Sequence, residues 1–356
     1  MTRPLPVDQW PELDRERWLA AQIPAGFLEP DRPASHWSPD RRVIVEAAYG
    51  RWLAFLGGHL DPCCTPGDRA TLARLRAFVT ELQAQVAPVS AGMIVGALLR
   101  MLVVLEPDRD WNFLGQVYRH LKQTAVPSRD KLARMVPAAD LFDLGLWLMK
   151  TWADHCPQRV HKATRYRDGL IIALLISCPI RLKNLAGLVI GQHLIFDGKG
   201  YRLQLTAAET KSGRPYIASV PRELTSFIDQ WLTIHRPALQ LVAAAGANTN
   251  SAAGALWIDR WGQTLSAKSI QRQIWLRTRQ AFGKGIHPHL FRDCAVTELV
   301  DVAPEEIGIA PDLLGHADLR TTRKYYIQAT GVTAHVRVQQ MIARRRAAAA
   351  RGGSDA

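Results

Sequence analysis

The sequence has few cysteines, and none of them is arranged for a bridge or a metal site. Five cysteines occur in 356 residues, and no two are spaced as C-x-x-C. An odd number of scattered cysteines argues against a disulfide framework. The tightest histidine cluster, His287 and His289, lacks a second ligand pair at zinc-finger spacing. We therefore expect no bound metal.

Nucleotide-binding and membrane signals are also missing. The chain contains neither GxxxxGKS/T nor GxGxxG, so neither ATP nor a dinucleotide is implied as a cofactor. The best apolar runs, GLIIALLIS and AGMIVGALL, fall short of the roughly 20 residues that span a membrane. The first residues, MTRPLPVDQW, carry prolines and an acid where a signal peptide has an apolar stretch. These features predict a cytoplasmic protein without cofactors.

Negative charge is scarce relative to positive charge. Lys and Arg number 45 against 32 Asp and Glu, which gives a net charge of +13 and a pI near 9.9. Such a balance favours a polyanionic partner, either a nucleic acid or an acidic membrane surface. A soluble enzyme with a merely basic surface explains the charge equally well.

Proline content and hydrophobic periodicity divide the first half of the chain. Residues 1–37 are predicted to be a proline-rich extension, irregular except for one short helix in ELDRERWLAAQI. From Ser38 the apolar residues recur at helical spacing, after a capping serine and a proline at the first helical position. We expect a compact helical domain at 38–124 and a linker at 125–140.

The second half mixes helices with a small sheet. HLIFDGKGYRLQLT predicts a strand, a turn and a strand, and YIASVP after the KSGRP turn predicts a third. The expected fold class is therefore mostly α with a small antiparallel β-sheet, in a second domain at 141–345. Residues 346–356 have the composition of a disordered tail.

One predicted helix, TLSAKSIQRQIWLRTRQAF, carries a basic face. Lys268, Arg272 and Arg279 recur at spacings of four and seven, while Ile270 and Ile274 share another face. A basic face suits contact with DNA phosphates. A solvated cationic stripe is the alternative.

Five short stretches of the second half carry residues suited to phosphate chemistry. They are CPIRLKNL (178–185), ETKSGRPY (209–216), HLFRD (289–293), LLGH (313–316) and TTRKYY (321–326). Each alone is compatible with an ordinary structural role, such as a solvated lysine or a core histidine. Their order and spacing carry more information than any one of them.

Taken together, the five stretches resemble the tyrosine recombinase (phage integrase) family over about residues 137–345. The resemblance implies a helical core-binding domain followed by an α+β catalytic domain. The matching positions imply a catalytic set of Arg181, Lys211, His289, Arg292, His316 and Tyr325. The family's nucleophile follows the LGH histidine by nine residues, which selects Tyr325 over its neighbour Tyr326.

Three positions depart from the family's usual pattern. Pro179 stands where glycine is common, Asn184 where an acidic residue is common, and Asp293 where histidine is common. These departures affect the support of the site more than its chemistry.

The implied reaction suits these residue types. Two guanidiniums offer planar, permanently charged forks for the non-bridging phosphate oxygens. His289 suits general acid–base work near neutral pH, and Lys211 could protonate the leaving 5′-oxygen. The resemblance further implies a 3′-phosphotyrosyl intermediate and a homo-tetramer on paired double-stranded DNA sites. The C-terminal segment GVTAHVRVQQMIARRR could dock on a neighbouring protomer or form a solvated basic tail.

Several functions stay open from the sequence. The leading hypothesis is the integrase or transposase of a mobile genetic element. A resident recombinase that resolves replicon dimers would use the same chemistry. Two further alternatives would not use this chemistry. One is a catalytically inactive DNA-binding accessory protein, and the other is a metal-dependent nuclease built on His287 and His289.

Overall fold

The computed structural model describes residues 3–27, 29–57, 64–126, 130–245, 254–302 and 310–314. The chain divides into two compact units, Met1–Asp130 and Lys131–Ala356. The division falls inside the segment 125–140 that the sequence suggested as a linker. Each unit has its own hydrophobic core.

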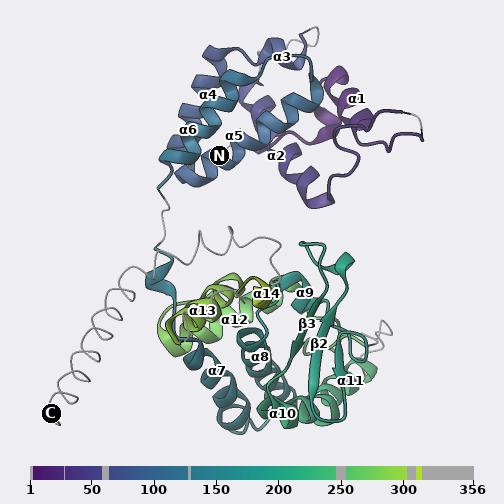
Figure 1. Ribbon diagram of the computed structural model, residues 1–356, viewed down its shortest axis with the longest axis vertical. Coiled ribbons are helices and arrows are strands. Elements are labelled where there is room, and N and C mark those ends of the chain that lie inside the picture. The colour runs from purple at the N-terminus through teal and green to yellow at the C-terminus, as the bar shows by residue number, and fades with distance from the viewer. Residues whose placement is uncertain are drawn as a thin grey trace, which may run out of the picture. The chain divides into compact units, whose positions relative to one another are not determined.

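The N-terminal unit is a helical bundle within the described residues (Figure 1). Its main helices are α2 (Pro39–Leu56), α3 (Pro66–Arg69), α4 (Leu72–Gln85), α5 (Pro88–Leu105) and α6 (Asn112–Thr124). Helix α2 begins as the sequence predicts, because Ser38 accepts a hydrogen bond from the amide of Arg41 and Pro39 occupies the first turn. Helix α5 packs between α2 and α6.

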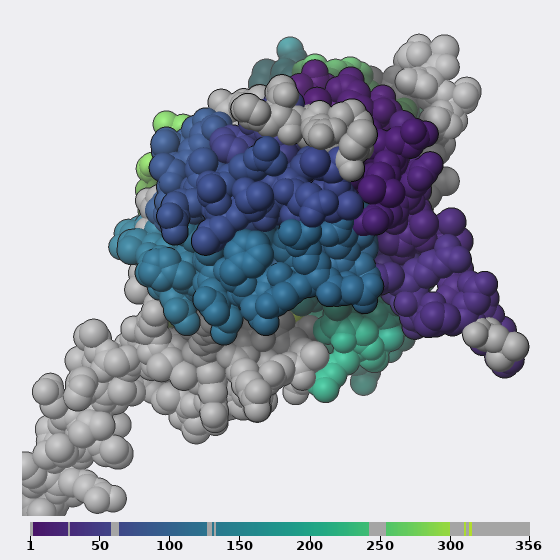
Figure 2. Space-filling model, turned by 90° about the horizontal axis from the view of Figure 1, so that it is seen from above, coloured from purple at the N-terminus to yellow at the C-terminus, as the bar shows by residue number. Residues whose placement is uncertain are grey.

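The first 37 residues differ from the expected extension. The 3-10 turn η1 (Val7–Gln9) and helix α1 (Glu12–Ala21) pack into the bundle, with Trp10 and Trp18 in its core. Figure 2 shows these purple residues lying against the blue and teal residues of the later helices. Burial of two large aromatic side chains stabilises the segment. The proline-rich segment is therefore packed against the bundle and is not a free extension.

A buried ion pair ties α1 to α3. Arg69 donates hydrogen bonds to the carboxylate of Asp14, and the hydroxyl of Tyr49 donates to the same carboxylate at 2.6 Å. Both Arg69 and Asp14 are fully buried. Sequence patterning could not reveal this pair, because its partners are 55 positions apart.

One helix of this unit, α5, is long and apolar enough to cross a membrane by length and composition. Its 18 residues have a mean hydropathy of 2.0, and 56% of that stretch is buried inside the protein. Packing against α2, α4 and α6 accounts for its apolar composition as that of a core helix.

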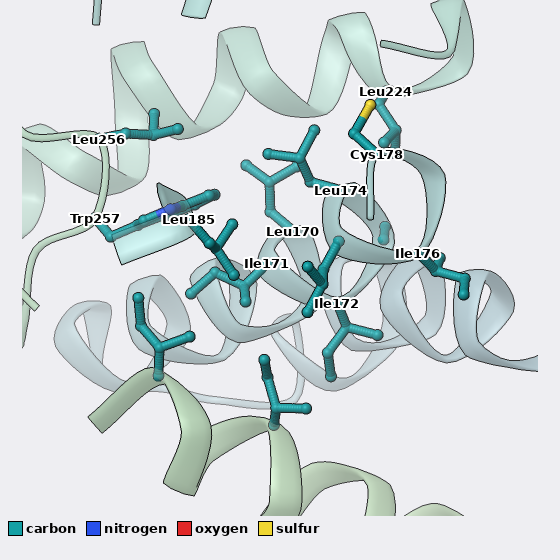
Figure 3. Packing of buried hydrophobic residues seen from close by; sticks show 14 of the residues in the cluster. Leu170, Ile171, Ile172, Leu174, Ile176, Cys178, Leu185, Leu224, Leu256 and Trp257 are labelled. Atoms are coloured by element: carbon teal, nitrogen blue, oxygen red, sulfur yellow. The ribbon is translucent and has the colours of Figure 1, made fainter. Parts of the chain in front are cut away.

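The C-terminal unit is built around α8 (Arg159–Ser177), which packs against α7 (Ala138–Trp147), α11 (Arg236–Ala245), α12 (Ala267–Phe282) and α13 (Pro288–Val302). Its apolar residues are buried nearly all round. Figure 3 shows Leu170, Ile171 and Leu174 of α8 packed among side chains from distant segments, which include Leu185, Leu224, Leu256 and Trp257. This helix fixes the positions of the shorter elements around it.

Two glycines bring α7 and α8 close together. A Cβ atom on Gly169 would lie 2.6 Å from the carbonyl oxygen of Gly145. Helix α7 then continues as the π-helical turn η4 (Leu148–Trp152), and a second π-helical turn, η7 (Trp231–His235), follows α10 (Thr225–Gln230). The remaining short helical elements are η3 (Leu132–Arg134), α9 (Leu182–Ala186), η5 (Ala207–Glu209), η6 (Arg222–Leu224) and α14 (Ala310–Leu314).

The sheet has the predicted antiparallel form. Strands β1 (Leu194–Phe196), β2 (Tyr201–Leu205) and β3 (Tyr216–Ser219) pair in the order β1-β2-β3. Leu194 pairs with Leu203, and Leu203 with Ala218, so the strands present one apolar face to the core. The mostly α fold with a small antiparallel sheet is confirmed.

The second part of the expected linker is held on the C-terminal unit. Arg134 donates to the carbonyl of Gly285 at 2.6 Å, and the ammonium of Lys284 donates to the carbonyls of Ala133 and Met135. Residues 131–137 therefore belong to this unit and not to a free connection.

Candidate active site

The turn between α8 and α9 carries the first arginine. Helix α8 ends at Ser177, because Pro179 lacks an amide hydrogen and disfavours the helical conformation at Cys178, whose φ is −127° and ψ 82°. Arg181 is the N-cap residue of α9, and its side chain is half-buried. Partial burial lowers the pKa of its guanidinium from the usual 12.5, but arginine keeps its charge in proteins.

Helix α13 carries the HxxR pair in its first turns. Arg292 is only 3% exposed and donates hydrogen bonds to the carbonyl of Pro179 and, at 2.5 Å, to the carbonyl of Leu314. Pro179 stands two residues before Arg181, and Leu314 stands two residues before His316. A single guanidinium thus joins three of the five motif segments.

His289 precedes Arg292 by one helical turn and is exposed to solvent. Partial burial lowers the pKa of its imidazole, the charge of Asp293 opposes that shift, and the positive charges of Arg292, Lys131 and Arg181 add to it. The lowered pKa favours the neutral imidazole near pH 7, the form that accepts a proton. The charge of Arg181 is thus among those that act on His289.

Asp293 has a structural partner in the segment before α7. Its carboxylate forms an ion pair with the ammonium of Lys131 at 2.8 Å, and Asp293 is only 4% exposed. At this position, where the family usually has histidine, a buried carboxylate therefore pairs with a partly exposed lysine. This contact fixes the start of the C-terminal unit to the helix that carries Arg292.

Lys211 lies in the loop between β2 and β3. Its side chain is exposed and makes no hydrogen bond or ion pair within the described part of the chain. The loop itself is held beside α9, because Asn184 donates to the carbonyl of Glu209 at 2.8 Å. In Figure 1, the loop between β2 and β3 ends at the same edge of the unit as α9 and α14.

Three of the predicted residues, His316, Tyr325 and Tyr326, lie outside the described residues. The structure brings Arg181, His289 and Arg292 together and places the Lys211 loop against the same short helix.

A buried tyrosine of β3 shares these surroundings. Burial raises the pKa of Tyr216 above its usual value, a nearby Cys178 adds to that shift, and the charge of Arg292 opposes it. The phenol therefore stays protonated at neutral pH and is a poor nucleophile. The sequence did not single out Tyr216, because its electrostatic interaction with Arg292 depends on how β3 pairs in the sheet.

The basic face of α12 has the predicted arrangement. Lys268, Arg272 and Arg279 are exposed, whereas Ile270 and Ile274 are buried. Arg277 of the same helix points elsewhere and pairs with the buried Asp168 at 2.8 Å. Three cations are thus left on one solvent-facing side of α12.

No metal cluster accompanies these residues within the described ranges. No group of three or more His, Cys, Asp or Glu side chains is placed there to hold a metal ion.

Comparison with known proteins relates this arrangement to one family. The sequence profile described as the phage integrase family matches residues 149–331, just over half of the chain. Tyrosine recombinase XerC of Pseudomonas fluorescens is 27% identical over 160 residues, which cover 45% of this chain and 48% of the relative. XerC of Alcanivorax borkumensis is 30% identical over 169 residues, with coverage of 45% and 47%. The chain spans about half the length of these curated relatives.

Two solved structures share the fold. The XerH site-specific recombinase bound to palindromic difH substrate, in a post-cleavage complex, gives a TM-score of 0.57 at 14% identity and covers 93% of this chain and 98% of that chain. A lambda integrase dimer bound to a COC′ core site gives a TM-score of 0.51 at 14% identity, with coverage of 88% and 93%.

Proposed function

This chain belongs to the phage integrase family, and on that basis we propose that it is a tyrosine-type site-specific DNA recombinase. It would cut and rejoin DNA strands through a 3′-phosphotyrosyl intermediate. The observation that carries the proposal is the hydrogen bonding of Arg292 to the carbonyls of Pro179 and Leu314. These hydrogen bonds connect the segment before the first arginine, the helix of the HxxR pair and the LLGH segment, which are far apart in sequence.

In the proposed reaction, the phenol oxygen of Tyr325 attacks the phosphorus of one backbone phosphate. An O–P bond forms, the bond from phosphorus to the 5′-oxygen breaks, and the phenol proton passes to His289. Arg181 and Arg292 stabilise the charge on the two non-bridging oxygens, and His316 donates a hydrogen bond to the same phosphate. To reach the phosphate, Arg292 would share its donors between it and the carbonyls.

Lys211 would supply the proton that the leaving oxygen needs. Its exposed ammonium lies on the loop that Asn184 holds beside α9, the helix whose N-cap residue is Arg181. Proton transfer leaves a neutral amine and a free 5′-hydroxyl. The hydroxyl of a second strand then attacks the phosphotyrosine in the reverse sense. Because the covalent link conserves the bond energy, no nucleotide needs to be hydrolysed.

Double-stranded DNA is the proposed substrate and partner. The net charge of +13 favours a polyanion, and Lys268, Arg272 and Arg279 present three exposed cations along one face of α12. We propose that these residues contact the DNA backbone. Exchange of two strands at two paired sites further requires several protomers, for which a homo-tetramer is the proposed assembly.

The proposed biological role is integration or transposition of a mobile genetic element. Resolution of replicon dimers is a second candidate, favoured by the similarity of the matched segment to XerC recombinases. A plasmid assay separates the two. Recombination between two identical sites supports resolution, whereas recombination confined to two different attachment sites supports integration.

Trapping the covalent intermediate tests the proposed chemistry. Wild-type protein incubated with nicked suicide DNA should form a protein–DNA adduct that maps to Tyr325, and Tyr325→Phe should abolish it. Tyr326→Phe is the matched control and should still form the adduct. Formation in EDTA is expected; loss in EDTA would favour the metal-dependent alternative. If the wild type forms no adduct, the enzyme proposal is wrong, and the result favours the alternative of a catalytically inactive DNA-binding accessory protein.

A further inference from the structure

The loop that presents Lys211 is held by a histidine–glutamate pair. His193 lies outside the five motif stretches, and Glu209 is the first residue of ETKSGRPY but was given no role there. We propose that His193 and Glu209 are positioning residues, which fix the β2–β3 loop so that Lys211 can reach the leaving oxygen. The inference rests on the proposed role of Lys211 as general acid and adds the device that orients it.

Glu209 is the centre of the contacts. One carboxylate oxygen accepts a hydrogen bond from Nε2 of His193 at 2.8 Å. The other accepts from the amide and the hydroxyl of Thr206, both at 2.8 Å, which closes a capping box around η5. These hydrogen bonds lower the pKa of Glu209 to about 2, and the bond from the amide of Thr206 makes the largest contribution to that shift. The carboxylate is therefore charged at neutral pH.

The hydrogen bonds fix the proton position on His193. Its Nδ1 accepts from the amide of Val189 at 3.0 Å, so that nitrogen carries a lone pair and Nε2 carries the hydrogen that is donated to Glu209. The side chain of His193 is 9% exposed, and its backbone pairs with Gln204 of β2. The imidazole therefore links the turn before β1 to the loop after β2.

The same loop is fastened on both sides of Lys211. Before it, the carbonyl of Glu209 accepts a hydrogen bond from Asn184 of α9. After it, the hydroxyl of Thr210 donates to the carbonyl of Arg214 at 2.6 Å, and the amide of Gly213 donates to the carbonyl of Thr210. Gly213 has a φ of +67°, which favours glycine at this turn. The backbone is thus held on both sides of Lys211, whose exposed side chain has no hydrogen-bond partner among the described residues.

This arrangement limits the positions that the ammonium of Lys211 can occupy. Its four-carbon stem can place the ammonium in many positions, and displacement of its backbone by about 1 Å can cost about 100-fold in rate. Loss of the His193–Glu209 contact releases one end of η5 and with it the loop. The consequence should fall on proton donation and not on DNA binding or on attack.

A substrate that needs no proton isolates that consequence. We would measure single-turnover cleavage of suicide DNA with either an ordinary 5′-oxygen or a 5′-bridging sulfur at the scissile phosphate, because a thiolate leaves without a general acid. Lys211→Ala should slow ordinary cleavage by about 100- to 10,000-fold. His193→Ala and Glu209→Ala should slow it by about 10- to 100-fold. All three should cleave the sulfur substrate at the wild-type rate.

Two further variants sharpen the test. His193→Gln keeps a donor near Nε2 and should recover part of the rate on ordinary DNA. Gln204→Ala removes a hydrogen bond to the carbonyl of Gln192 in the same sheet, leaves Glu209 untouched, and should behave as wild type. Because Glu209 is exposed, Glu209→Ala is expected to fold even if His193→Ala does not.

The outcomes separate the two proposals. Equal slowing of Glu209→Ala on both substrates, or no slowing on either, overturns the positioning role while Lys211→Ala still shows rescue. If Lys211→Ala is not rescued by sulfur, the general-acid assignment itself is wrong, and the positioning role falls with it.

Discussion

Replacement of Arg292 should reveal a structural function that Arg181 lacks. Arg292→Met removes the donors from the buried carbonyls of Pro179 and Leu314. A buried carbonyl left without a donor costs about 1–3 kcal/mol, so two should lower the free energy of unfolding of the C-terminal unit by about 2–6 kcal/mol. Arg181 is half-buried and has no hydrogen-bond or ion-pair partner in the described ranges. Arg181→Met should therefore change stability by less than about 1 kcal/mol.

The assay is hydrogen–deuterium exchange on the full chain, since it reports each unit separately. Amides of α8 and α13 should lose protection in Arg292→Met and keep it in Arg181→Met. In the proposed reaction, both variants should also form the covalent adduct about 100- to 1,000-fold more slowly, because each lacks one guanidinium at the phosphate. Equal protection in the two variants would refute the bridging role of Arg292.

Three further predictions follow from packing and protonation. Gly169→Ala forces a Cβ against the carbonyl of Gly145 and should destabilise the C-terminal unit by about 1–3 kcal/mol, whereas Gly115→Ala in open space should not lower the melting temperature. Burial, together with the charge of Lys162, lowers the pKa of His235 to about 4. The unfolded state therefore binds more protons than the folded state between about pH 6.5 and 4. As the pH falls through that window, the free energy of unfolding should decrease by about 3 kcal/mol. Urea titrations of His235→Phe should show a smaller fall. Asp14→Ala leaves Arg69 buried without its carboxylate and should cost about 3–5 kcal/mol, measured by thermal unfolding; a neutral effect would mean that α1 is not part of the N-terminal core.

Local signals in the sequence were sufficient for most elements. Ser38 and Pro39 mark the start of α2, and the turn DGKG separates β1 from β2. The helical spacing of Ile270 and Ile274 correctly predicted the buried face of α12. Capping, turn formation and amphipathic spacing each depend on residues a few positions apart, so they can be recognised without knowledge of the fold.

Residues 1–37 show where local signals fail. Seven prolines in the first 40 residues suggested an extension, yet Trp10 and Trp18 are buried in the N-terminal unit. Proline restricts the backbone but does not prevent packing between its positions. The partners of α1, which include Tyr49 and Arg69, are too distant in sequence for any periodic pattern to disclose.

The order of the five motif stretches was enough to identify the family and to name candidate residues, since spacing along the chain is a property of the sequence. Tertiary structure alone placed Arg292 between the carbonyls of Pro179 and Leu314 and paired His193 with Glu209. The physical reason is that a hydrogen bond requires two atoms within about 3 Å. Whether segments up to 113 residues apart meet at that distance is decided by the packing of α8, α9 and α13.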